Sequence, residues 1–71
     1  MTRETAKEVS ELMQAILAQL DQSVRRVQEK EPDADFQRYR RAVGKVLGAV
    51  VLDIMNPLYA EHPDLKPPQL K

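Results

Sequence analysis

The most apolar stretch of this 71-residue chain is Arg41-Ala42-Val43-Gly44-Lys45-Val46-Leu47-Gly48-Ala49-Val50-Val51-Leu52-Asp53-Ile54-Met55. Only three of its fifteen residues are charged. No proline interrupts the chain between Pro32 and Pro57, and the apolar residues recur at intervals of three and four, which is typical of a helix. The sequence therefore predicts a helix over residues 33–56.

The apolar side chains of this helix cover a wide arc when each residue advances by 100°. With the glycines included, the arc is about 200°, against the roughly 100° or slightly more of an ordinary surface helix. One neighbouring helix cannot cover such an arc, so a second contact surface is predicted. The arc is centred on Phe36, Val43, Leu47, Val50 and Ile54, with Val46 and Tyr39 at one edge and Val51, Gly44, Met55 and Gly48 at the other.

Two glycines lie one helical turn apart near the edge of this arc. Small residues at that spacing let another backbone approach closely, although two glycines four apart also occur by chance. We predict a helix–helix or dimer interface on this edge, formed by Gly44, Gly48, Val51, Met55 and Leu47.

The same apolar run is a poor candidate for a membrane span. From Ala42 to Met55 it has 14 residues and carries Lys45 and Asp53. A span needs about 20 mostly uncharged residues. The sequence therefore favours a chain that does not contact a membrane.

A second amphipathic helix precedes the central one. Apolar residues alternate at three and four from Ala6 to Val27, and Thr5 with Glu8 matches a capping box, with Thr2 as an alternative cap one turn earlier. This helix is predicted over residues 4–30. Pro32 disfavours helical geometry at the residue before it, so the connection is short and the two helices should be antiparallel neighbours.

The chain after Asn56-Pro57 is rich in proline. Leu58 to His62 can form one further turn with Pro57 at its first position. We predict a helical hairpin over residues 1–58 and an extended tail over residues 59–71. The tail is either a loose end or a strap anchored by Leu65 and Leu70.

The composition excludes most kinds of catalytic site. The chain has no cysteine, one histidine and no glycine-rich phosphate loop. No Ser-His-Asp set or paired core carboxylates can be recognised, so we expect neither an enzyme nor a cofactor or metal. No apolar leader is visible near Met1, and a cytoplasmic location is the expectation.

The wide apolar arc favours an interaction module. Chains of this size without disulfides or metals often gain stability by oligomerising. We predict an all-α protein in which two hairpins pair into a homodimeric four-helix bundle. Its outer surface or its tail would then bind a protein partner that the sequence does not identify.

The alternative hypothesis is a helical dimer that binds nucleic acid through a basic stripe on the second helix. The zero net charge, from 11 basic and 11 acidic residues, argues against it. Acidic residues near the same end of the hairpin would also offset the field. The candidate contacts are Arg25, Arg26, Arg38, Arg41 and Lys45.

Overall fold

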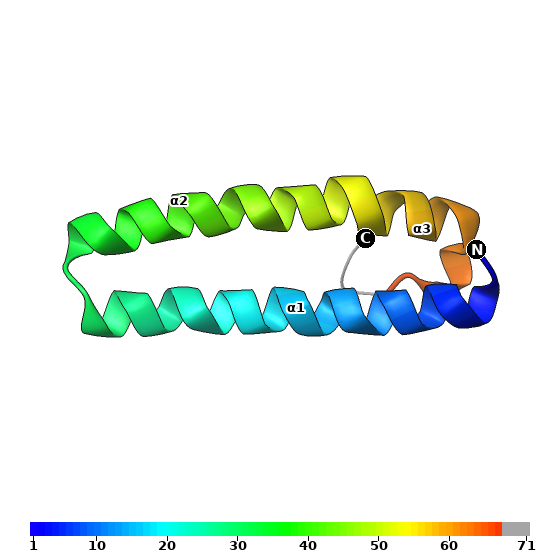
Figure 1. Cartoon of the computed structure of the whole chain (residues 1–71), viewed down its shortest axis with the longest axis horizontal. Coiled ribbons are helices and arrows are strands. Elements are labelled where there is room, and N and C mark those ends of the chain that lie inside the picture. The colour runs from blue at the N-terminus through cyan, green and yellow to red at the C-terminus, as the bar shows by residue number, and fades with distance from the viewer. Residues whose placement is uncertain (68–71) are drawn as a thin grey trace.

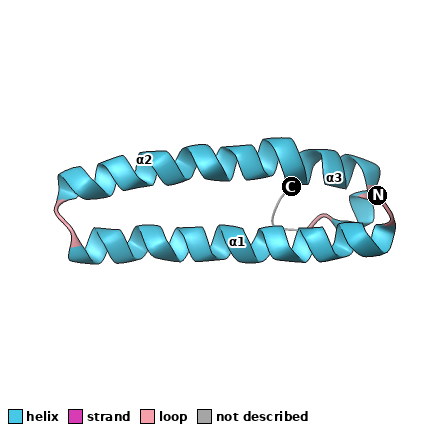
Figure 2. Cartoon of the chain, in the orientation of Figure 1, coloured by secondary structure: helices cyan, strands magenta, loops and turns pink. Residues whose placement is uncertain are grey.

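The computed structural model describes residues 1–67, and they form two long helical arms that lie side by side in opposite directions (Figure 1). The first arm is α1 (Arg3–Lys30). The second begins with α2 (Asp33–Ala49), passes through a π-helical turn (Val50–Met55) and ends with α3 (Asn56–Glu61). The predictions of an all-α chain and a helical hairpin are confirmed for these residues, where Figure 2 shows helices and loops only.

Local sequence explains where the arms begin and end. The Thr2 side chain accepts a hydrogen bond from the Thr5 N–H at 3.3 Å, so α1 is capped by the alternative, Thr2, and not by Thr5. At the other end, Glu31 is extended because it precedes Pro32. The chain therefore reverses within two residues, between Lys30 and Asp33.

The second arm does not end at Asn56 as predicted. Pro57 has no N–H, and in a regular α-helix its ring would clash with the carbonyl of Asp53. The wider π turn before it relieves this conflict, and the Asn56 N–H bonds to the Val51 carbonyl instead. The helix continues to Glu61, so the segment predicted to be extended starts later than Tyr59.

The π turn also changes which side chains face the core. A π turn advances less per residue than an α-helix, so the residues after it are rotated from the positions that a regular period predicts. Ile54, predicted at the centre of the apolar arc, is 41% exposed. Met55, predicted at the edge, is only 1% exposed and is the most deeply buried large side chain of residues 1–67.

The core lies at the end of the hairpin away from the turn, where the first residues of the chain meet the end of the second arm. Its buried cluster joins the start of α1 to the π turn and α3, and Leu65, in a 3-10 turn over Pro63–Leu65, packs against it. Leu65 thus has the contact that was expected of a strap anchor, whereas Leu70 lies outside the described residues. The cluster consists of Ala6, Val50, Met55, Leu58 and Tyr59.

The rest of the hairpin is less well covered. Val43 is the other buried hydrophobic residue of the described chain, and the remaining apolar side chains between the helices are half-buried. Near the turn, the two arms are linked by Ser23 and Tyr39, whose hydroxyls lie 2.8 Å apart. One hairpin therefore buries its own apolar surface mainly at one end.

Candidate interaction surfaces

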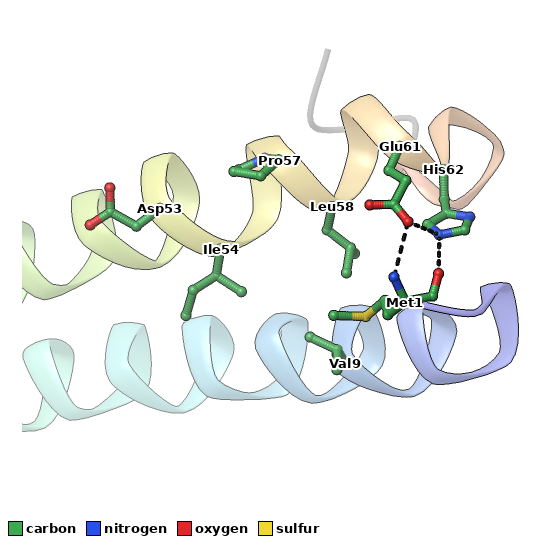
Figure 3. A pocket seen from close by; sticks show the side chains of 8 residues that line it. All are labelled: Met1, Val9, Asp53, Ile54, Pro57, Leu58, Glu61 and His62. Carbon is green, nitrogen blue, oxygen red and sulfur yellow. Dashed lines mark hydrogen bonds and ion pairs between the residues drawn. The ribbon is translucent and has the colours of Figure 1, made fainter.

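A shallow apolar pocket opens between the two arms near the termini (Figure 3). It has a volume of about 260 Å³. Figure 3 shows Ile54 and Leu58 pointing from the second arm towards Val9 on α1. Leu65 packs on the same core but does not line this pocket. The full lining is Met1, Val9, Asp53, Ile54, Pro57, Leu58, Glu61 and His62.

Exposed apolar side chains extend this pocket along the hairpin. On α1, Leu12 follows Val9 by three residues and is 56% exposed. On the second arm, Val46 lies two turns before Ile54 and is 50% exposed. We call this side of the hairpin, with Leu12, Val46 and Ile54 around the pocket, the open face. The sequence pattern placed Ile54 in the core and did not single out Leu12 as a surface residue.

Polar contacts join the first residues of the chain to the end of the second arm. The Met1 amine lies 3.1 Å from Glu61 Oε1, and His62 Nε2 lies 3.1 Å from the Met1 carbonyl oxygen. Arg3 Nε donates to Asp64 Oδ2 at 2.8 Å. All of these contacts are exposed, so each contributes little by itself. Together they form a terminal clasp at the rim of the pocket.

The clasp favours the charged form of its two carboxyls. A hydrogen bond from the Met1 amine holds the pKa of Glu61 below its usual value of 4.5. A hydrogen bond from Arg3 lowers the pKa of Asp64 from its usual 3.8. Burial raises both pKa values, but less than these contacts lower them.

Acidification is expected to loosen the clasp. Because the pKa of Asp64 is lowered in the folded chain, its contribution is fully present above pH 3.8 and is lost as the pH falls further. The melting temperature should therefore drop between pH 6 and pH 3, and Asp64→Asn should lower it at pH 6 while reducing the later drop. Asp53→Asn is the control, because Asp53 makes no ion pair among residues 1–67. An equal drop in wild type and Asp64→Asn would contradict the role of this contact.

The predicted glycine interface is not a close contact within the hairpin. Gly44 is exposed and Gly48 is half-buried, and a Cβ added to either would meet nothing within 4 Å. Leu47 and Val51 are half-buried, whereas Met55 lies inside the core. We call Gly44 and Gly48 the glycine edge. Of the five residues predicted for an interface, Met55 lies in the contact between the two arms and is not available to a second chain.

Gly44→Ala is expected to stabilise the protein by about 0.5–1 kcal/mol. Alanine is the better helix former, and the added methyl group meets open space. Urea unfolding followed by circular dichroism measures the change, with Ala42→Gly as the reverse substitution on an exposed position of the same helix. Destabilisation by Gly44→Ala would instead reveal another backbone packed against this edge.

The five basic residues predicted to contact nucleic acid are all exposed, but they do not form one surface. Arg38, Arg41 and Lys45 follow each other at three and four residues and lie opposite the buried side of α2. Arg25 and Arg26 lie on the outer side of α1. Arg25 pairs with Asp21 at 3.3 Å, and Arg38 pairs with Asp35 three residues before it. The hairpin therefore separates the two groups and partly neutralises each.

By length and composition alone, the continuous helix from Asp33 to Glu61 is long and apolar enough to cross a membrane. Its most apolar stretch of 18 residues has a mean hydropathy of 1.3, and 22% of that stretch is buried in the hairpin. The core helix of a soluble protein and a signal sequence pass the same test, so one such helix is weak evidence for a membrane span. Residues 1–67 contain no group of three or more side chains that could hold a metal ion.

No protein-family model, curated protein or solved structure matches the chain. Any function must therefore be argued from the surfaces described above.

Proposed function

We propose that this protein is a small, non-enzymatic helical interaction module that acts as a homodimer, with two hairpins forming a four-helix bundle. The observation that carries the proposal is the one-sided core of the single hairpin. Its buried cluster lies at the terminal end, while Leu12, Val46, Leu52 and Ile54 are between 41% and 65% exposed. A second copy would cover part of this surface.

Energetic considerations support a second copy. A domain of this size rarely gains more than a few kcal/mol from one core. Each Leu, Ile or Val moved from water into an interface adds roughly 1.5–3 kcal/mol when it is fully buried. A few exposed residues on each copy can therefore contribute as much as the core of the hairpin itself.

Sedimentation equilibrium over a wide concentration range tests this proposal. We expect the mass of a dimer at micromolar concentrations and a melting temperature that rises with concentration. A folded monomer at all concentrations would overturn the homodimer. The exposed apolar residues would then have to be covered by a different protein.

The homodimer would leave its outer surface and its tail free to bind a protein partner. Binding of nucleic acid is the alternative, and the separation of Arg25 and Arg26 from the basic stripe of α2 weighs against it. A mobility assay at low salt distinguishes the two. Affinity that falls steeply with salt and is lost in Arg41→Glu would favour the nucleic-acid hypothesis.

A further inference from the structure

We infer that the open face is the surface that binds a second copy of this chain, and that the two hairpins associate antiparallel, with the turn of each beside the termini of the other. This inference rests on the homodimer proposed above and adds its interface and its orientation. Three features of the hairpin support it: the position of the exposed apolar residues, the size of the face and the distribution of charge.

The exposed apolar residues are concentrated on the open face. Ile54 lines the pocket together with Val9 and Leu58, and the helical spacing places Leu12 and Val46 farther along the same side. Among residues 1–67, Leu65 packs against the core and does not line this pocket. The glycine edge presents less apolar surface to a second copy, because positions 44 and 48 have no side chains.

The size of the face fits a dimer of this kind. The hairpin measures 44 by 19 by 16 Å, so its broad side has an area of about 840 Å² in projection. A stable interface buries about 800 Å² on each partner. Two hairpins that stack by this side would therefore bury an area sufficient for a specific complex.

The distribution of charge along the hairpin favours antiparallel association of the two copies. The terminal half of the described hairpin, residues 1–16 and 47–67, has six Asp or Glu and three Lys or Arg, so its side chains are net negative. The turn half, residues 17–46, has five Asp or Glu and seven Lys or Arg, so it is net positive. Antiparallel association places opposite charges side by side at both ends, whereas parallel association would place like charges together. Such complementarity sets the orientation more than the affinity.

Distances between spin labels test the orientation. The natural chain has no cysteine, so a single introduced cysteine carries one label on each copy. With Gln28→Cys, near the turn, we expect a distance close to the 44 Å length of the hairpin. A distance near its 19 Å width would show a parallel dimer and would overturn the inference. Gln19→Cys, near the middle of α1, is the control, because its two labels should lie close together in either orientation.

Two matched leucine substitutions test the interface. Leu12→Ser, on the open face, should lower the dimer affinity at least tenfold in sedimentation equilibrium. Leu52→Ser should change it less than threefold, because Leu52 lies one turn after Gly48 and outside the open face. Both side chains are more than half exposed, so the hairpin should keep its helical circular dichroism in each case.

The outcomes separate this inference from the homodimer itself. If wild type is a dimer that Leu52→Ser or Gly48→Leu dissociates while Leu12→Ser does not, the glycine edge is the interface. The homodimer would then stand and the open face would be excluded. If wild type is a monomer at all concentrations, the homodimer itself is wrong.

Discussion

Met55→Ala should destabilise the protein by about 2–5 kcal/mol, the usual cost of truncating a large buried side chain to alanine. Met55 is 1% exposed and lies in the cluster that joins α1 to the π turn and α3. The neighbouring cluster residues cannot collapse fully into the space, because they are held in α1, the π turn and α3. Since so small a domain has only a few kcal/mol of stability, the variant should be largely unfolded at 37 °C.

Urea unfolding at one protein concentration measures this effect, with two controls from the same π turn. Leu52→Ala, at a position that is 65% exposed, should change the free energy of unfolding by less than about 0.5 kcal/mol. Ile54→Ala should cost less than Met55→Ala, since Ile54 is 41% exposed. At a concentration at which the chain is a monomer, so that no second copy covers Ile54, the reverse order, with Ile54 more costly than Met55, would mean that the helix keeps a regular α period through this region.

The sequence predicted the elements of the fold but not the phase of the second helix near Pro57. The helices, the turn at Pro32 and the antiparallel arrangement follow from periodicity and proline, and they are confirmed within residues 1–67. A fixed step of 100° per residue could not predict that Met55 is buried while Ile54 is exposed. Proline at position 57 was treated as a stop, whereas a widened turn lets the helix pass it. A proline that follows a long apolar run can therefore change the phase of a helix without ending it.

The candidate surfaces were predictable only in part. The excess of apolar residues on the second helix was visible in the sequence, and the structure leaves Val46, Leu52 and Ile54 exposed. Which side of the hairpin is open depends on where α3 and Leu65 pack, and no local pattern contains that information. The basic stripe Arg38, Arg41 and Lys45 was correctly placed on one face of α2. Arg25 and Arg26, the other two candidate contacts, are exposed on the first arm, and their contact with nucleic acid stays a prediction.

Ser10→Ala should destabilise the protein by about 1–3 kcal/mol, more than Tyr59→Phe at about 1 kcal/mol. The Ser10 and Tyr59 hydroxyls lie 2.6 Å apart inside the core, and Gln14 Nε2 donates to Ser10 Oγ at 3.1 Å. Removing the serine hydroxyl deprives both Tyr59 and Gln14 of a partner. Removing the tyrosine hydroxyl leaves Ser10 with Gln14. Leaving a buried group unpaired costs more than losing one hydrogen bond whose partner has another.

A double-mutant cycle measured by urea unfolding tests this asymmetry. The combined variant, Ser10→Ala with Tyr59→Phe, removes both hydroxyls and should cost less than the sum of the two single changes. Ser23→Ala with Tyr39→Phe is the matched cycle at the turn, where the hydroxyls lie 2.8 Å apart but are only partly buried. Its coupling should be smaller, because water can replace either partner there. Equal coupling at both sites would mean that the terminal end is as accessible to water as the turn, and the one-sided core on which the homodimer rests would then be wrong.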